Sequence, residues 1–274
     1  MLYSELFSRS LQKLGRHELT VAVEVLIERA FGLSRTQFWI RRNQEIDNAR
    51  NLAAFRRAFS KLLKDEPLAY ITGEKEFYSH PFAVNRRVLI PRPETEFLVE
   101  KALALNPPPA TILDIGSGSG NIAISLALRS AARVWALEKS RAAHSVLKRN
   151  IAHFDLETRV IPLLADLFPV RQIRFDLIVS NPPYLSCREW DRLPRMIRDF
   201  EPKEALVSGP KGTEVIEAII FQAPRFLPAG GCLLLEAGRG QHRSVSRFLK
   251  ESGFGGIEWI RDLQGIPRVV MARK

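Results

Sequence analysis

Cysteine is scarce in this sequence, which has only Cys187 and Cys232 among 274 residues. The two form no C-x-x-C pair and have no neighbouring histidines. A disulfide framework and a cysteine-histidine zinc site are therefore excluded. We expect two reduced thiols and no bound metal.

Long apolar runs are also absent. The longest segment without a charged side chain, 115–128, contains three glycines and is shorter than the roughly 18 apolar residues that a bilayer span needs. The first 15 residues carry Glu5 and lack the basic start, continuous apolar core and cleavage site of a secretory signal. We therefore expect a cytoplasmic protein that does not associate with membranes.

Charge of one sign is in excess, with 41 Lys and Arg against 30 Asp and Glu, a net charge of +11 and a pI near 10.0. The excess is spread along the chain, and no basic block occurs. In the dense segment 188–199, acids are interleaved with the arginines, which weakens the attraction of polyanions. Solvated helix faces are one interpretation and a partner-binding surface is the other. We expect no stable nucleic-acid complex.

Residues 1–66 are predicted to form a small helical domain, because apolar side chains recur at helical spacing in 2–14, 19–30 and 52–63. Gly32 is expected to end one helix, and Ser34 with Gln37 forms the capping box of the next. Residues 67–109 are predicted to be a connector with a β-hairpin between 69 and 90, a helix over 94–105 and a stiff linker of three prolines.

Residues 110–274 alternate between short apolar runs and helical patterns. Expected strands are 111–115, 134–137, 160–164, 175–179 and 232–236, and expected helices are 122–128, 141–150, 215–226 and 245–250. This alternation is typical of an α/β fold with a mostly parallel, doubly wound sheet. Segments 257–260 and 268–272 are expected to pair antiparallel at one edge.

A glycine-rich turn follows the first of these strands: Gly116, Ser117, Gly118, Ser119 and Gly120 lead directly into a helix. A dinucleotide fingerprint would need glycine at position 121, which is Asn. No Gly-Lys dipeptide occurs, which excludes a Walker A loop, and Gly118 stands where a nucleophile elbow would need Ser. The remaining common interpretation is an S-adenosylmethionine site, with Asp114 near the methionine ammonium.

Acidic residues follow the next two strands. Glu138 is placed to accept hydrogen bonds from ribose hydroxyls. Asp166 could face the adenine amino group, with Leu167 and Phe168 against the ring. Together they surround one switch point of the sheet, which favours a cofactor site over isolated polar residues.

The segment Asn181-Pro182-Pro183-Tyr184 follows the fourth strand and is expected beside the glycine loop. Proline has no N–H to donate, so the Pro182 carbonyl can stay free. The Asn181 side-chain oxygen and this carbonyl could accept both protons of a planar amide or amino group. Tyr184 would stack on the plane of the amide or base. Such a site would act by positioning, without a dedicated general base.

The chain resembles the release factor glutamine methyltransferases of the HemK/PrmC family over nearly its whole length. The matching segments are 66–73, 89–96, 114–120, 181–184, 201–202 and 205–206, continuing to Gly209 and Gly212. The resemblance implies methyl transfer from S-adenosylmethionine to the side-chain amide nitrogen of the Gln in the Gly-Gly-Gln loop of class I peptide chain release factors. It also implies a helical domain that grips the release factor and a Rossmann-like class I methyltransferase domain with a seven-stranded sheet that ends in an antiparallel hairpin. We expect a monomer.

The resemblance also assigns residues. Residues 116–120 and Glu138 resemble cofactor contacts, 181–184 resemble the glutamine site with Asn181 also bordering the cofactor, and Arg92 and Glu94 belong to a pocket wall between the domains. Two residues depart from the family pattern. Glu138 stands where Asp is more usual, and Leu167 stands where an aromatic residue often flanks the adenine.

Two other enzymes remain as alternatives. A ribosomal-protein glutamine methyltransferase shares the glycine loop and 181–184, and segment 91–96 argues against it. An adenine-N6 methyltransferase of DNA or RNA would suit the net charge of +11, but no basic block or target-recognition domain occurs. A non-catalytic cofactor-binding module is a third class, and the intact loop and Asn181 argue against it.

Overall fold

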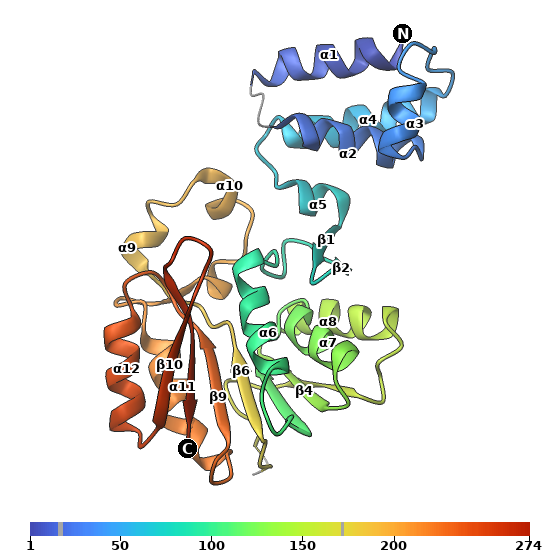
Figure 1. Ribbon diagram of the computed structural model, residues 1–274. Coiled ribbons are helices and arrows are strands. Elements are labelled where there is room, and N and C mark those ends of the chain that lie inside the picture. Colours follow the sequence, from blue (N-terminus) through green and yellow to red (C-terminus); the bar gives the residue numbers. More distant parts are fainter. Residues whose placement is uncertain (16–18, 171–172) are drawn as a thin grey trace. The chain divides into compact units, whose positions relative to one another are not determined.

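The computed structural model describes residues 1–15, 19–170 and 173–274, and these form two compact units, 1–73 and 74–274. Figure 1 follows the chain through both units. The predicted division at residues 66 and 109 stays a prediction. Within the described ranges, no helix has the length and apolarity needed to cross a membrane.

The first unit is helical, as predicted. Its helices are α1 (Tyr3–Leu14), α2 (Thr20–Phe31), α3 (Arg35–Ile40), α4 (Ala49–Leu62) and α5 (Leu68–Thr72). Gly32 ends α2 in the left-handed conformation, and Ser34 and Gln37 form the expected capping box of α3. The amphipathic helices bury a common core that includes Phe38 and Phe55. Helix α5 occupies the start of the segment that was predicted as a hairpin.

The second unit begins with the expected β-hairpin, which is confirmed over β1 (Glu74–Phe77) and β2 (His80–Ala83). A short 3-10 helix, η2 (Pro93–Thr95), leads into α6 (Glu96–Leu103). Asn150 joins this hairpin to the glycine loop: its side chain exchanges two hydrogen bonds with the Ala83 backbone and donates a third to the Ser119 carbonyl at 2.7 Å.

A seven-stranded sheet forms the centre of the second unit. Its strands are β3 (Thr111–Ile115), β4 (Arg133–Glu138), β5 (Val160–Leu164), β6 (Leu177–Ser180), β9 (Cys232–Glu236), β10 (Gly255–Arg261) and β11 (Pro267–Arg273). The spatial order is β10-β11-β9-β6-β3-β4-β5, and only the pairings of β11 are antiparallel. The predicted fold class and terminal hairpin are confirmed. The predicted fourth strand, 175–179, begins and ends slightly later in the structure.

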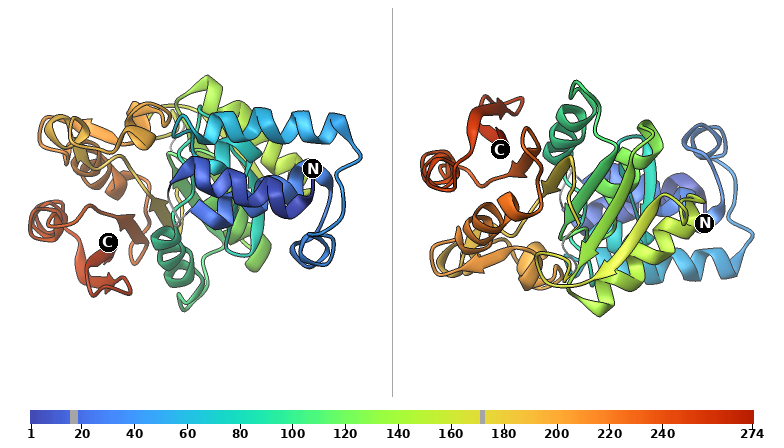
Figure 2. Two further views of the ribbon diagram at one scale, coloured as in Figure 1. Left: turned by 90° about the horizontal axis from the view of Figure 1, so that it is seen from above. Right: turned by 90° about the horizontal axis from the view of Figure 1, so that it is seen from below.

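Helices cover both faces of this sheet. They are α6, α7 (Asn121–Arg129), α8 (Arg141–His153), α11 (Glu214–Gln222) and α12 (His242–Glu251). Neighbouring residues of one strand point to opposite faces. Accordingly, Ile112 packs in a core with α6, α7 and α8, whereas Leu113 packs in a second core with α11 and α12. The two groups of helices can be followed in Figures 1 and 2.

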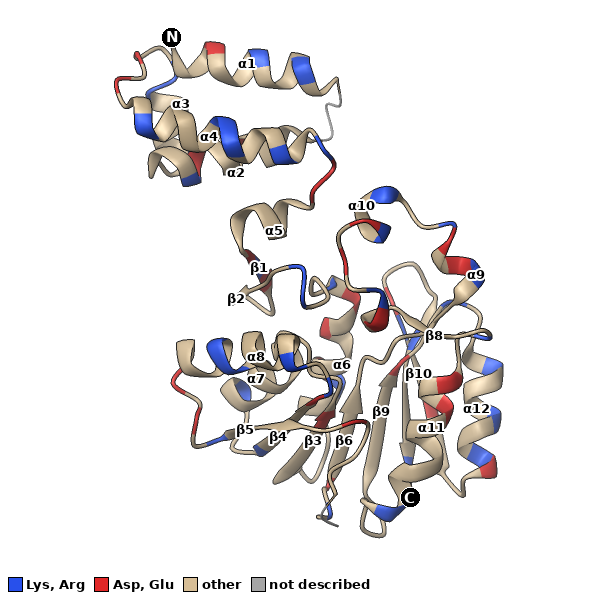
Figure 3. Cartoon of the chain, turned by 180° about the vertical axis from the view of Figure 1, so that it is seen from behind, with Lys and Arg blue, Asp and Glu red and all other residues tan. Residues whose placement is uncertain are grey.

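Short elements follow the fourth sheet strand. They are β7 (Leu185–Ser186), α9 (Cys187–Trp190), α10 (Arg195–Arg198), the 3-10 helix η3 (Lys203–Ala205) and β8 (Val207–Gly209), with a further 3-10 helix, η4 (Ala223–Arg225), after α11. Strands β7 and β8 pair parallel. Acidic and basic residues are interleaved in the segment that contains α9 and α10 (Figure 3), and Asp199, directly after α10, accepts from both Arg195 and Arg198.

Candidate active site

A cavity of about 270 Å³ lies at the carboxyl ends of the parallel strands. Ligands bind at this edge in open α/β sheets, where the strand order reverses. The predicted site residues that line it are Gly116, Gly118, Glu138, Asp166, Leu167, Asn181, Pro182 and Pro183. The predicted residues outside its lining are Asp114, Ser117, Ser119, Gly120, Tyr184, Arg92 and Glu94.

The glycine loop forms one wall of the cavity. The Leu137 carbonyl accepts the backbone N–H groups of Gly116 at 2.8 Å and Ser117 at 2.9 Å. Gly116, Gly118 and Gly120 all have positive φ angles, which favour glycine. A Cβ added at Gly116 or Gly118 would meet open space, so the backbone presents a bare cradle there.

Gly120 and Gly118 have different structural roles, so we expect alanine substitutions at the two positions to have different effects on stability and cofactor binding. A Cβ at Gly120 would lie 2.6 Å from Leu147 Cδ1, inside the core. Gly120→Ala should therefore lower the free energy of unfolding by about 2 to 5 kcal/mol, from backbone strain and overpacking. Gly118→Ala should cost only about 1 to 2 kcal/mol, from backbone strain, and should weaken cofactor binding by filling the cradle.

Denaturant unfolding and calorimetric titration with S-adenosylmethionine measure the two effects separately. Equal stability losses in Gly118→Ala and Gly120→Ala would contradict this division of roles. So would cofactor affinity that Gly118→Ala leaves at the level of the unmodified protein.

Glu138 joins the glycine loop to the end of β4. One carboxylate oxygen accepts the Gly118 N–H at 3.0 Å, and the other accepts the Ser140 N–H at 2.8 Å. Each carboxylate oxygen has a second lone pair, so the group can hold the loop and still accept from a diol.

Asp114 lies beneath the loop and is fully buried. Neither of its carboxylate oxygens has a hydrogen-bond partner among the described residues. Burial raises the pKa of Asp114 to about 7. A buried carboxylate without a partner fits a cationic ligand group. Together with the open glycine cradle and Glu138, it makes this site suitable for S-adenosylmethionine.

Asp166 and Leu167 line the cavity beyond β5. Leu167 has a φ of 58°, which is strained for a side chain of its size. Phe168, by contrast, is buried against Phe226 with ring centroids 4.5 Å apart. It packs in the core and does not line the cavity.

The segment after β6 forms the opposite wall. The Asn181 side-chain nitrogen donates to Thr95 Oγ1 at 3.0 Å. In the described parts of the chain, no donor contacts Asn181 Oδ1 or the Pro182 carbonyl. Two acceptors therefore stand available on neighbouring residues of the cavity wall. Tyr184 packs in the core beside α11, and burial, followed by the charge of Glu236, raises the pKa of its hydroxyl.

Arg92 and Glu94 lie beside the site without lining it. Arg92 forms an ion pair with the buried carboxylate of Glu201, which also accepts the Ile90 N–H. This arrangement ties the segment before η2 to the turn that precedes η3. Glu94 is half-buried, and its charge contributes to raising the pKa of Glu236.

Sequence reasoning missed several residues of the site. Val88, Val215, Ala218 and Ile219 supply much of its apolar wall. Gln241 donates to the Tyr184 carbonyl at 2.8 Å and the Gly212 carbonyl at 3.0 Å, which fixes the end of the wall formed by 181–184. The helical spacing of 215–226 could have indicated that residues of α11 line the site. No sequence pattern indicated the role of Gln241.

Two family models match the chain. The model described as the PrmC N-terminal domain matches residues 5–73, and the model described as the methyltransferase small domain matches residues 93–201. The first match coincides with the helical unit. The second contains the glycine loop and 181–184.

Curated relatives match over most of their length. A release factor glutamine methyltransferase from Geobacter sulfurreducens is 38% identical over 261 residues, which cover 94% of this chain and 91% of the relative. Another, from Rhodopirellula baltica, is 35% identical and covers 96% and 92%. A third, from Neisseria gonorrhoeae, is 37% identical and covers 92% and 93%.

Solved structures show the same fold at lower identity. A methyltransferase from Pyrococcus furiosus is 16% identical with a TM-score of 0.57, covering 78% of this chain and 96% of that one. A ribosomal protein L11 methylase from Lactobacillus delbrueckii is 20% identical with a TM-score of 0.50, covering 67% and 80%. The Rossmann-like methyltransferase fold is thereby shown.

Proposed function

The chain belongs to the family of release factor glutamine methyltransferases, and from this premise we propose that it methylates the side-chain amide nitrogen of the Gly-Gly-Gln glutamine in class I peptide chain release factors. The observation that supports this substrate best is the pair of available acceptors, Asn181 Oδ1 and the Pro182 carbonyl, on the cavity wall. An amide N–H₂ group has two protons to donate, and two fixed acceptors orient its plane.

The chain's own residues act by positioning. With both amide protons held, the nitrogen lone pair is directed out of the plane of the two hydrogen bonds, toward the glycine loop. Alignment of this kind in a cavity that excludes water can lower a barrier by several kcal/mol. S-adenosylmethionine, when bound, would supply the methyl group from its positively charged sulfur, which is left as a neutral thioether. The amide nitrogen would gain the methyl group and give up one of its two protons to water as the product leaves. Gly116, Gly118, Glu138, Asp166 and Leu167 would hold it, with Asp114 beneath the loop.

The partner assignments follow from the same premise. We assign the helical unit, 1–73, to docking of the release factor, because it matches a family model of its own and lies outside the methyltransferase fold. We also propose that the enzyme acts as a monomer. Because the proposed substrate is a protein, the enzyme needs no basic surface for binding a nucleic acid. Release factors act in the cytoplasm, so we expect the enzyme there.

Mass spectrometry of a full-length release factor after incubation with the enzyme and S-adenosylmethionine tests the proposal. We expect one added methyl group on the glutamine of the Gly-Gly-Gln loop. A release factor whose loop glutamine is replaced by alanine is the matched control and should remain unmodified. Methylation of ribosomal protein or of nucleic acid without methylation of release factor would refute the proposal.

A further inference from the structure

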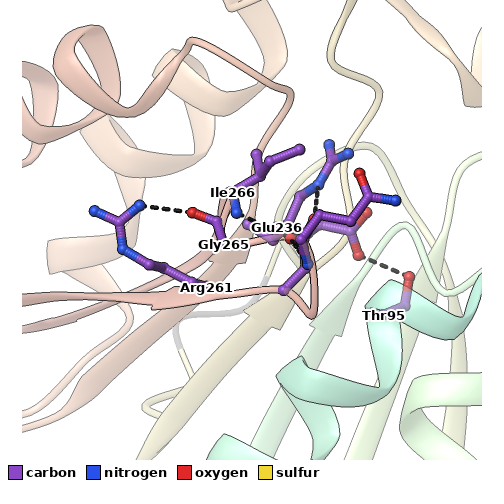
Figure 4. A network of polar contacts seen from close by, with 8 residues as sticks. Thr95, Glu236, Arg261, Gly265 and Ile266 are labelled. Atoms are coloured by element: carbon purple, nitrogen blue, oxygen red, sulfur yellow. Dashed lines mark hydrogen bonds and ion pairs between the residues drawn. The ribbon is translucent and has the colours of Figure 1, made fainter.

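A chain of hydrogen bonds runs from the cavity wall into the interior behind Asn181. The Asn181 side-chain nitrogen donates to Thr95 Oγ1 at 3.0 Å, and the Thr95 hydroxyl donates to Glu236 Oε2 at 2.7 Å. Figure 4 shows Thr95 and Glu236 facing each other across the second of these bonds. Thr95 and Glu236 are each only 1% exposed, and neither lines the cavity.

The fold itself brings these residues together. Strands β6 and β9 are parallel neighbours in which Ser180 pairs with Leu235. The next residues, Asn181 directly after β6 and Glu236 at the end of β9, therefore lie side by side. Thr95 ends η2 directly before α6, and α6 packs against both strands. The order of the sheet strands therefore places Asn181 next to Glu236, and the packing of α6 on both strands brings Thr95 to them.

The direction of these hydrogen bonds follows from donor and acceptor chemistry. An ionised carboxylate only accepts, so it takes the single proton of the Thr95 hydroxyl. The Thr95 oxygen is then left to accept from Asn181. The two ends of an amide are nearly equal in size, so packing alone does not choose between them. The hydrogen bond to Thr95 selects the orientation in which the Asn181 nitrogen faces Thr95 and Oδ1 is the free end of the amide.

We propose that Thr95 and Glu236 are positioning residues for methyl transfer, which hold the Asn181 amide with its oxygen available to the substrate amide. This inference rests on the proposed function, because it requires a substrate that donates an N–H. If the Asn181 amide turned over, its N–H₂ group would face the substrate N–H₂ group. Two donors would then oppose each other, and the alignment that lowers the barrier would be lost.

Protonation of Glu236 would reverse the direction of these hydrogen bonds. Burial raises the pKa of Glu236 to about 7. The groups that face it are Thr95 and Glu94 from η2, Tyr184 from the segment after β6, and Arg268 from β11. A protonated carboxyl can donate to Thr95, which frees the hydroxyl proton for Asn181 Oδ1. Because the ionised form holds the productive direction, kcat should fall as the pH falls through about 7.

The test compares three substitutions with a matched control. Thr95→Val removes the hydroxyl at constant shape, Thr95→Ser keeps it, and Glu236→Gln removes the titration. Thr111→Val is the control, because the Thr111 hydroxyl also donates to a carboxylate, that of Asp176, at 2.9 Å, but at the opposite end of β3 from the cavity.

We expect Thr95→Val to lower kcat about 10- to 100-fold, with little change in the KM for release factor or in the Kd for cofactor. Thr95→Ser should restore most of kcat. At saturating cofactor, the acidic limb of the kcat profile should be present in Thr111→Val and absent in Glu236→Gln. A Thr95→Val enzyme whose kcat lies within about threefold of the control, or an acidic limb that persists in Glu236→Gln, would overturn the proposal.

A second measurement needs no substrate and so separates this inference from the proposed function. In the NMR spectrum of the full chain, the Asn181 side-chain N–H₂ signal is identified by its absence in Asn181→Asp. It should shift with an apparent pKa near 7 in the unmodified protein and in Thr111→Val, and lose this titration in Thr95→Val and Glu236→Gln. An Asn181 signal that does not titrate would overturn the proposed roles of Thr95 and Glu236. Failure of the unmodified enzyme to methylate release factor would refute only the proposed function.

Discussion

Replacing Asn181 with alanine is expected to lower kcat for methylation of release factor by about 100- to 1,000-fold, the cost of removing one oriented polar contact to the reacting group. Asn181 Oδ1 is one of two available acceptors on the cavity wall, and its loss leaves the substrate amide free to rotate. Single-turnover kinetics with pre-bound cofactor measure the change directly. Calorimetric titration should show a cofactor Kd within about twofold of the unmodified value.

Asn181→Asp makes the matched comparison. It keeps the shape and one acceptor oxygen, but its second oxygen replaces the N–H₂ group and cannot donate to Thr95, and it adds a negative charge near the buried Glu236. We expect a comparable loss of kcat, because the amide that Thr95 orients is gone. If cofactor affinity fell in Asn181→Ala as much as kcat does, Asn181 would belong to the cofactor site and not to the substrate site.

The fold was largely predictable because its signals are local. Strand β3 is bounded by the residues expected from its apolar run, and Ser34 with Gln37 caps α3 as predicted. The insertion of β11 between β10 and β9 was not predictable. The apolar run 269–272 predicts a strand whether it lies at the edge or one place inward, because only long-range pairing distinguishes the two.

The residues of the candidate site likewise fall into those that local sequence patterns predict and those that depend on long-range pairing. The glycine loop and Asn181 could be predicted because they occupy turns directly after apolar runs. Glu138 could be predicted because it ends the strand that follows the glycine loop, where nucleotide-binding folds place an acid. Glu236 gave no such signal, because it ends an apolar run, 232–236, that predicts only a strand. Its contact with Thr95 depends on β9 lying next to β6, which is a property of the whole sheet.

Asp114→Asn is expected to change how stability depends on pH. Burial raises the pKa of Asp114 from 3.8 to about 7, so between these values the folded protein holds a proton that the unfolded chain has lost. The free energy of unfolding contributed by this group is therefore full below about pH 4 and falls as the pH rises toward 7. Between pH 5 and pH 7 the fall amounts to about 2 kcal/mol.

Urea unfolding at pH 5 and pH 8 measures this contribution. The unmodified protein should lose about 3 kcal/mol more stability over this interval than Asp114→Asn does. Glu236, whose pKa burial also raises to about 7, is present in both proteins, so the difference isolates Asp114. An identical pH dependence in the two proteins would show that Asp114 does not titrate in this range.

The same substitution tests whether Asp114 faces the cationic end of the cofactor. A positive charge beside the Asp114 carboxylate favours its ionised form, so at pH 7 Asp114 should release part of its proton when S-adenosylmethionine binds. Titration calorimetry in buffers of different ionisation enthalpy should detect this release in the unmodified protein and not in Asp114→Asn, which should also bind about tenfold or more weakly. Equal proton release in both would place the ammonium elsewhere and leave Asp114 a role only in supporting the glycine loop from beneath.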